Sequence, residues 1–444
     1  EPNIIAHAQL ITPDIAATSL GLVAMWFYWR WLARKSWSTA LLSGMSLGLA
    51  VVAKFSWLIL FGIWPTLWLI SQLRTPASSK KPGAFSGLFQ LVTSLLAALY
   101  LINTVYAFDG SFSRLDSFEF ASTRLSGHDQ TGGLGNRFTG TTIAGLRLPL
   151  PRQFVLGLDL QQKDFEHFPH QSYLRGDWRQ GGWWYYYLYA AAVKIPLGLW
   201  LLGFTAIAMS IICRRPDVED SRDRNIACTI LLVPSAILFA IVSSQTAFNH
   251  HFRYVLPCFG PAFVLISPIA TASSRALKSW AFANGTWIAI SSALAAPFSL
   301  SYFNELAGGR HNGSAHLLHS NIDWGQDLVA LNQWIASNPD SRPLYLAYYG
   351  FYDPVAYGVP ALDAPQGPFW RGLPRDWSFR PGWYAVSVNY LHGTAWRLTN
   401  RHAYEPLRDE TPIAWCGGSI AIYEVDQILA KKLNDAVLRN RQSP

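Results

Sequence analysis

One lysine, Lys54, interrupts an otherwise apolar run, LGLAVVAKFSWLILFG, over residues 47–62. A charge is costly inside a bilayer, and ionisable side chains found there usually face a polar cavity or a partner charge. An ammonium group just beneath the outer membrane face could pair with a carboxylate or another anion, and a lipid-linked phosphate would present its charge at that depth. The plainer alternative is snorkelling, in which the lysine stem carries its charge to the lipid headgroups.

A second candidate for phosphate binding is Arg253, which stands beside Tyr254 in the stretch FRYVLP. Arginine binds phosphate through paired donors, and we predict that both residues contact a donor phosphate. An arginine at a helix end is equally ordinary among headgroups. His250 and His251 precede them and could bind a metal ion with a carboxylate from residues 108–183. Neighbouring histidines seldom point at one ion, so we assign no metal ligand and leave a divalent cation open as a cofactor.

Carboxylates gather after the last apolar stretch, at Glu305 and in the sequence DWGQD, which contains Asp323 and Asp327. We predict that these three residues contact the acceptor of a transferred group. Helix capping offers an explanation without any function, because Asp323 or Asn321 could cap an amphipathic helix over residues 324–336.

The composition is that of a membrane protein. Of 444 residues, 50% are hydrophobic and only 14% are charged, against about 25% charged residues in soluble domains. Several apolar stretches reach the roughly 20 residues that cross a bilayer as a helix. Four scattered cysteines predict neither a disulfide framework nor a metal site. The net charge of +8 follows the loops between apolar stretches and does not indicate a nucleic-acid partner.

Length and apolar content predict eight membrane spans: Ile15–Leu32, Thr39–Ala53, Phe55–Gln72, Phe85–Ala107, Trp184–Cys213, Ile226–Ser244, Tyr254–Thr271 and Trp280–Phe298. Every second connection carries the lysine and arginine excess of cytoplasmic loops, from Arg34, Lys35, Arg74, Lys80, Lys81, Arg214, Arg215, Arg222, Arg224, Arg275 and Lys278. Residues 1–13, 108–183, 245–253 and everything after 299 are therefore expected on the outer side. The span over 39–53 climbs only about 22 Å, which leaves Lys54 at a turn below the outer face.

We divide the chain into four parts. Residues 1–107 form the N-terminal membrane part, 108–183 a large outer loop, 184–298 the C-terminal spans, and 299–444 an extracytoplasmic α/β domain. Strand-like runs at Leu344–Tyr349, Trp383–Tyr390 and Ile420–Val425, followed by a polar helix near Gln427–Arg439, support that last assignment. The predicted fold class is a polytopic α-helical membrane protein with an α/β C-terminal domain.

Six stretches, in order along the chain, resemble the PMT-type glycosyltransferases of the GT-C superfamily. These membrane enzymes include dolichyl-phosphate-mannose protein mannosyltransferases and bacterial aminoarabinose transferases. The likeness covers most of residues 2–330, and the stretches are PNIIAHAQLITPD, GMSLGLAVVAKFS, GWWYYYLYAAAVKIPL, HFRYVLPCFGPAFVL, YFNELAGGRHNG and SNIDWGQDL.

The resemblance implies transfer of a sugar from a polyprenyl-phosphate donor to a protein, lipid or glycan acceptor at the outer face of a bacterial inner membrane. It matches Lys54 with the family lysine near the donor phosphate and the catalytic acid. It matches Asp14 with the aspartate of the TPD element. His7, one to two turns before it, is expected to contact the donor phosphate together with Lys54, Arg253 and Tyr254. The Asp14 carboxylate could orient the lysine or activate the acceptor. The family's catalytic base lies in the first outer loop, which we expect before Glu1, so we regard the chain as a fragment.

Two other functions stay open. A transporter of lipid-linked glycans predicts inverted repeats and several charges in mid-membrane, whereas the predicted spans are nearly free of charge apart from Lys54 and Lys194. An inactive scaffold with a carbohydrate-binding outer domain would lack the acidic residue of the first outer loop.

Overall fold

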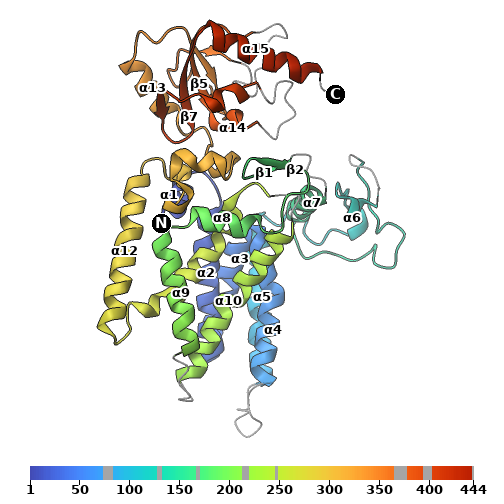
Figure 1. Cartoon of the computed structure of the whole chain (residues 1–444). Helices are drawn as coiled ribbons and strands as arrows, with labels where there is room; N and C mark the ends of the chain where they lie inside the picture. Colours follow the sequence, from blue (N-terminus) through green and yellow to red (C-terminus); the bar gives the residue numbers. More distant parts are fainter. Residues whose placement is uncertain are drawn as a thin grey trace.

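The computed structural model describes residues 1–73, 84–127, 133–166, 171–212, 220–245, 249–364, 378–393 and 403–442. A bundle of long helices occupies one end of the molecule and a domain built on a β-sheet occupies the other (Figure 1). Short helices and loops lie between these two parts. Some residues that carry the predicted topology lie outside the described residues, namely Arg74, Lys80, Lys81, Arg214 and Arg215.

The bundle is helical because an α-helix satisfies its own backbone polar groups, which lipid cannot do. Its helices are α2 (Asp14–Arg34), α3 (Trp37–Ala53), α4 (Leu60–Leu73), α5 (Ala84–Val105), α9 (Leu197–Ile212), α10 (Asp220–Ser244), α11 (Phe259–Ile266) and α12 (Arg275–Ala295). Two 3₁₀ segments, η1 (Phe55–Ile59) and η5 (Phe252–Cys258), lead into α4 and α11. Helical structure therefore lies over all eight predicted spans.

Fewer helices than the eight predicted segments qualify as candidate spans among the described residues. Four helical stretches are long and apolar enough to cross a membrane: Phe55–Leu73, Phe85–Val105, Arg224–Ser244 and Phe252–Ile269. Two bent pairs qualify together, α1 (Pro2–Gln9) with α2 and α8 (Tyr186–Lys194) with α9. The described residues thus hold four to six candidate spans, which identifies a helical membrane protein, and α3 is a shorter apolar helix.

The predicted span over Trp184–Cys213 is not one straight helix. The chain bends by 113° between α8 and α9, where Ile195 is extended and Pro196 follows. Proline disfavours the helical conformation of the residue before it, and it lacks the N–H that would continue the ladder. Both α8 and α1, which is bent from α2 by 114°, therefore lie across the end of the bundle that faces the sheet domain (Figure 1).

Helix α3 packs between α2 and α5 through small side chains. Ala40, Gly44, Gly48 and Ala50 are buried along it, and small residues allow membrane helices to approach closely. A Cβ atom added at Gly44 would overlap the backbone of Ser94 in α5. The glycine therefore sets the distance between the two helices.

A side segment leaves the bundle after α5 (Figure 1). It contains α6 (Thr123–Ser126), α7 (Arg152–Glu166) and a hairpin of β1 (Ser172–Leu174) and β2 (Asp177–Arg179). Asp159 of α7 accepts hydrogen bonds from the backbone N–H groups of Ala121 and Ser122, which ties the segment together. Trp178 in the hairpin donates from its indole to the carbonyl of His392 at 2.8 Å, so the hairpin contacts the sheet domain.

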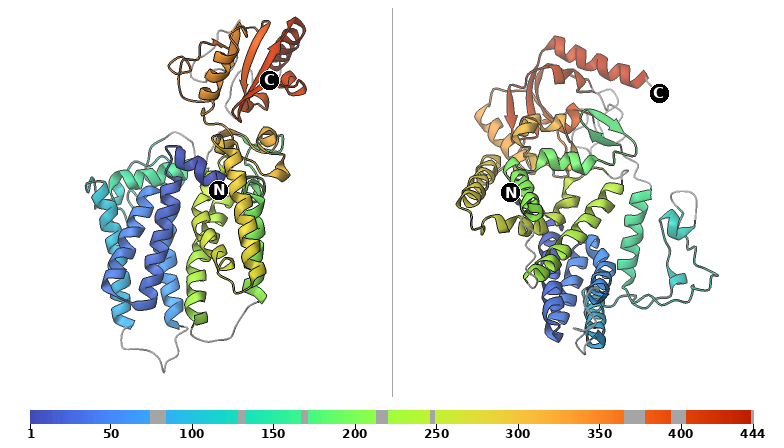
Figure 2. Two further views of the ribbon diagram at one scale, coloured as in Figure 1. Left: turned by 90° about the vertical axis from the view of Figure 1, so that its left-hand side faces the viewer. Right: turned by 60° about the horizontal axis from the view of Figure 1, so that its bottom comes forward.

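The sheet domain has strand order β4–β3–β5–β7–β6. Strands β4 (Leu362–Asp363), β3 (Leu344–Ala347) and β5 (Gly382–Ser387) are parallel, whereas β7 (Ile420–Val425) is antiparallel to β5 and to β6 (Ala414–Cys416). Successive strand residues point to opposite faces, so one face packs on α13 (Leu328–Ser337) and the other on α15 (Gln427–Gln442). Figure 2 shows the helices on the two sides of this sheet.

The strand predictions overlap β3, β5 and β7, and the predicted terminal helix overlaps α15. The capping prediction is wrong, because α13 begins at Leu328 with Asp327 before it and without a side-chain cap. The Asp323 side chain instead accepts from the Gly325 N–H at 2.9 Å. Asn321 donates to the carbonyls of His250 and Leu318. Both residues close the turn ahead of the helix.

We predict that Gly44→Ala destabilises the protein by about 1–3 kcal/mol, the usual cost of overpacking, because the added methyl group must push α5 away. The matched control is Gly62→Ala in α4, where a Cβ would meet open space. Thermal unfolding in detergent should show a lower midpoint for Gly44→Ala and an unchanged or higher one for Gly62→Ala. Equal midpoints for the two variants would show that the α3–α5 contact is not close.

Candidate functional site

The centre of the site is an ion pair between Lys54 and Asp14. Lys54 Nζ lies 2.5 Å from Asp14 Oδ1. The Asp14 side chain is 1% exposed and that of Lys54 is 17% exposed. The lysine therefore pairs with a buried carboxylate, which favours the paired-charge interpretation over snorkelling.

Three local features bring the pair together. Lys54 is the first extended residue after α3 ends at Ala53, and Asp14 is the first residue of α2 after the bend from α1. Trp57 in η1 then packs on α2: its indole donates to the Ala17 carbonyl at 2.7 Å. This contact holds the segment after Lys54 beside the first turn of α2.

Arg253 and Tyr254 lie in the same cluster, and their contact with a phosphate stays a prediction. Arg253 Nη1 lies 3.5 Å from Asp14 Oδ2, so one carboxylate lies between two cations. The Tyr254 ring lies under both of them, with Lys54 Nζ 5.2 Å and the Arg253 guanidinium carbon 5.6 Å from its centroid. Such cation–π contacts orient the cations without neutralising them.

His7 of α1 also belongs to this neighbourhood, since Asp14, Lys194, Arg253 and Lys54 all act on it electrostatically. Its ring is 4% exposed, and Nδ1 has no hydrogen-bond partner among the described residues. The Nε atom of Arg253 is likewise buried and without a hydrogen bond in this part of the chain. Buried polar atoms usually have partners, so these two mark a place where ligand oxygen atoms would fit.

Lys194 has a structural task instead. It is 1% exposed, and its ammonium donates to the carbonyls of Leu300 and Asn321, both at 2.8 Å. Asn321 in turn accepts from the Phe252 N–H at 2.8 Å. Lys194 therefore holds the chain after α12 against the segment that carries Arg253.

The neighbouring histidines point to different partners. His251 Nδ1 is hydrogen-bonded to the Ser320 hydroxyl, whereas His250 contacts the ring of His319 at 5.2 Å between centroids. His319 has a positive φ of 59°, an uncommon conformation for a residue with a side chain. Among the described residues no group of three or more His, Cys, Asp or Glu is arranged to hold a metal ion.

The three predicted acceptor residues do not share one surface. Asp323 and Asp327 are 1% and 0% exposed. Asp323 accepts from the Ser387 hydroxyl at 2.5 Å, and Asp327 Oδ2 accepts from the N–H groups of Gly418 and Ser419. These carboxylates anchor the turns of the sheet domain and are closed to an acceptor.

Glu305 lies apart from those two anchors. It is exposed, and Oε1 accepts from Trp287 and Ser291 of α12 at 3.0 Å each. An acceptor contact therefore stays a prediction for Glu305 alone.

Sequence reasoning missed the residues that extend the site toward the sheet domain. A cavity of about 200 Å³ lies next to Arg253 and is lined by His251, Arg253, Ser320, Trp324, Tyr349, Gly350 and Phe351. The DWGQD motif pointed to this region, but through its carboxylates and not through Trp324. The loop over 349–351 follows a predicted strand, and only the fold brings it here.

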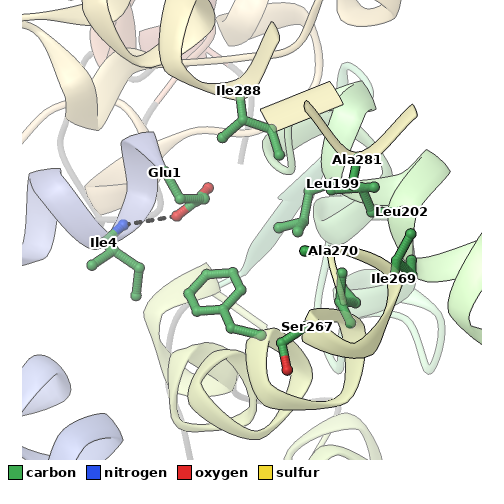
Figure 3. Close-up of a pocket in the computed structure, with 11 residues that line it drawn as sticks. Glu1, Ile4, Leu199, Leu202, Ser267, Ile269, Ala270, Ala281 and Ile288 are labelled. Atoms are coloured by element: carbon green, nitrogen blue, oxygen red, sulfur yellow. Dashed lines mark hydrogen bonds between the residues drawn. The ribbon is translucent and has the colours of Figure 1, made fainter. Parts of the chain in front are cut away.

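Two mainly apolar cavities lie elsewhere in the bundle. One, of about 390 Å³, lies between α1, α9, α11 and α12, and Figure 3 shows the Glu1 side chain at its margin accepting from the Ile4 N–H. The other, of about 530 Å³, is lined by Leu22, Val23, Met25, Trp26, Trp29, Ala227, Ile230, Leu231 and Val264. Neither contains a residue of the cation cluster, and both suit hydrocarbon better than a sugar phosphate.

The sheet domain should lose stability as the pH rises. Burial, with the nearby Asp327, raises the pKa of Asp323 to about 7, whereas an unfolded aspartate titrates near ~3.9. Between those values the unfolded state ionises first, so the free energy of unfolding falls by up to ~1.4 kcal/mol per pH unit and levels off above pH ~7.

Asp323→Asn stays neutral and should remove most of that slope. Labelling of the buried Cys416 during thermal unfolding of the full chain at pH 4.5 to 7.5 reports on this domain. The wild-type midpoint should fall relative to that of the variant over this range. If the midpoints of the wild type and of Asp323→Asn change with pH in parallel, the raised pKa of Asp323 is contradicted.

Comparison with known proteins does not assign the chain to a family. No protein-family model, no curated protein and no solved structure matches the chain.

Proposed function

We propose that this chain is a membrane glycosyltransferase that moves a sugar from a polyprenyl-phosphate donor to an acceptor at the outer face of the membrane. The observation that carries the proposal is the cluster in which Lys54 and Arg253 share the single carboxylate of Asp14. Two positive charges against one negative charge leave one positive charge. A sugar phosphodiester carries one negative charge, so the cluster is complementary to it.

The apolar cavity along α2 supports a donor with a lipid tail. Asp14 begins α2, and the cavity starts at Leu22 on the same helix, about 12 Å further along at 1.5 Å per residue. A lipid phosphate held by the cations would thus have an apolar path beside its headgroup. The arrangement favours an amphiphilic ligand over a soluble nucleotide sugar.

In the proposed reaction an acceptor oxygen attacks the anomeric carbon of the sugar. The bond from that carbon to the phosphate oxygen breaks, and its electron pair leaves with the polyprenyl phosphate. Direct displacement inverts the anomeric centre. The acceptor hydroxyl passes its proton to a general base, which the family resemblance assigns to the first outer loop and not to any residue of this cluster.

Lys54 and Arg253 would stabilise the second negative charge that appears on the phosphate as the bond breaks. Asp14 is buried and lies against both cations, so its position suits orienting them rather than abstracting a proton. The Tyr254 ring supports the same two side chains. No bound metal is required by this charge arrangement, and a divalent cation stays open as an addition to it.

The charge distribution supports an outward-facing site. Helix α12 begins with Arg275 and Lys278 at the end of the bundle away from the sheet domain (Figure 1). Lys35 at the α2–α3 turn lies near Gly87 in the first turn of α5. Basic residues therefore gather at one end of the bundle and the cation cluster lies at the other, as the positive-inside rule predicts for a cytoplasmic and an outer end.

The central test replaces Lys54 by Met in the full-length protein. Loss of the ammonium should abolish consumption of a labelled polyprenyl-phosphate hexose, because neither the ground-state phosphate nor the leaving charge is then neutralised. Lys278→Met is the matched control, since this exposed lysine lies at the other end of the bundle. It should retain full turnover.

Removing one member of a buried pair can cost ~3–5 kcal/mol, so Lys54→Met alone could fail to fold. Lys54→Gln keeps a hydrogen-bond donor beside Asp14, which stays paired with Arg253, so this variant should insert and unfold like the wild type while remaining inactive. Normal turnover by the folded Lys54→Gln variant would remove the ammonium from the mechanism.

The orientation is tested separately by cysteine labelling in intact cells. A membrane-impermeant thiol reagent should label Asp340→Cys, which is exposed in the sheet domain, and should not label Lys278→Cys until the membrane is opened. The reverse pattern would place the cation cluster on the cytoplasmic side and overturn the proposed donor geometry.

A further inference from the structure

The cavity beside Arg253 is built by three separate segments of the chain. His251 and Arg253 come from the segment that enters α11, and Ser320 and Trp324 come from the chain after α12. The remaining wall, residues 349–351, is the loop after strand β3 of the sheet domain. The sheet domain is therefore part of the site and not an appendage to it.

The topology of the sheet explains why this loop reaches the membrane part. Strands β3 and β5 are parallel, so both end at the same edge of the sheet. Asn389, just after β5, accepts from the His319 N–H at 2.7 Å, and Ser387 at the end of β5 binds Asp323. In α/β sheets the carboxyl ends of parallel strands are the usual place for ligands.

Tyr348 holds the loop over 349–351 next to the turn that carries Trp324. Its hydroxyl donates to the Gly325 carbonyl at 3.1 Å, and the side chain is fully buried. A Cβ added at Gly325, where φ is +80°, or at Gly350 would overlap that hydroxyl. Both glycines are therefore needed for the tyrosine to hold the loop and the Trp324 turn together.

Arg253 connects this cavity to the phosphate cluster. Its guanidinium lies 3.5 Å from Asp14 on one side, and its central carbon lies 4.6 Å from the centroid of the Trp324 ring. A group bound in the cavity would be adjacent to a phosphate held between Lys54 and Arg253. In a sugar phosphodiester that adjacent group is the sugar ring.

The size and lining of the cavity define the sugar. Its volume of about 200 Å³ is below the roughly 300–1,000 Å³ of sites for drug-sized ligands, which suits one ring and not an oligosaccharide. Trp324, Tyr349 and Phe351 supply aromatic surface for the apolar C–H face of a sugar, and Ser320 and His251 supply polar atoms. None of the seven described lining residues carries a carboxylate that could pair with an amino sugar.

The positive charge of the cavity is already engaged. Arg253 faces Asp14 and would face the donor phosphate, and it is the only lysine or arginine among those seven lining residues. Burial and the charge of Arg253 hold the pKa of His251 well below its ordinary value, so that ring is neutral. No further charge is left to bind the carboxylate of a sugar acid.

We propose that this cavity binds the sugar ring of the donor and selects an uncharged monosaccharide, with the loop after β3 as one wall. The inference rests on the proposed function, because it requires the donor phosphate to occupy the Lys54–Arg253 cluster. It adds the class of sugar and assigns specificity residues in the sheet domain.

The test measures binding of two labelled lipids to the full chain, polyprenyl phosphate without a sugar and the same lipid carrying an uncharged hexose. Phe351→Ala removes an exposed aromatic wall and should weaken binding of the sugar-bearing lipid by about tenfold, the order of one lost aromatic contact. Binding of the sugar-free lipid should not change. The control is Tyr352→Ala, a neighbouring exposed ring outside the cavity lining, which should affect neither lipid.

Gly350→Ala provides a second variant that shifts the loop without removing a ring, and it should also weaken only the sugar-bearing lipid. If both variants weaken binding of the two lipids equally, or if neither variant weakens binding of either lipid, the sugar site is overturned and the phosphate site stands. If the wild type binds neither lipid, the proposed function falls with it.

The selectivity is tested with the wild type alone. A hexuronate and an amino sugar, each on the same polyprenyl phosphate, should bind at least about tenfold more weakly than the uncharged hexose. Equal binding of either charged sugar would overturn the assignment to an uncharged monosaccharide.

Discussion

The buried carboxylate of Asp14 is the interaction on which the rest of the site depends. It lies against Lys54 and Arg253 at once, and removing an ion from water costs several kcal/mol unless a partner compensates. Moving either cation away from Asp14 would leave a buried charge without a partner, so both side chains are held in place. Because one negative charge cannot neutralise two positive ones, the same contact leaves an excess positive charge in a place of low dielectric, where an incoming anion is bound strongly.

The helices meet this constraint by ending or bending at the same level. Helix α3 ends one residue before Lys54, α2 begins at Asp14 after a bend of 114°, and η5 carries Arg253 in a 3₁₀ segment. Backbone outside an α-helix is tolerated at membrane depth where it is buried in protein or lines a cavity. The end of α3, the bend before α2 and the 3₁₀ segment η5 therefore together form a polar site inside the helical bundle. Lys194 reinforces it from behind by holding the chain after α12 to the segment of Arg253.

The sheet domain continues the same core. Buried residues of α8, η5, the chain after α12, strands β5 and β7, and helix α15 belong to one hydrophobic cluster. A shared core restrains the two parts against each other, whereas parts joined only by a linker move freely. The loop after β3 can consequently form a wall beside Arg253, and the buried Asp323 and Asp327 hold the turns that flank it. The domain therefore contributes to the geometry of the site through residues that do not themselves face it.

Local pattern alone determined the membrane character, the positions of the helices and three of the strands, and it singled out Lys54 and Arg253 as candidates for a charged site. Those features follow from apolar length and from the cost of a charge in an apolar run, and both can be read along the chain. The anchoring role of Asp323 and Asp327 and the cavity of Trp324 and Phe351 were decided by tertiary structure alone. Each depends on which distant segment supplies the partner: a carboxylate is an anchor once Ser387 and Ser419 surround it, and an aromatic residue lines a cavity only once a parallel strand ends beside it.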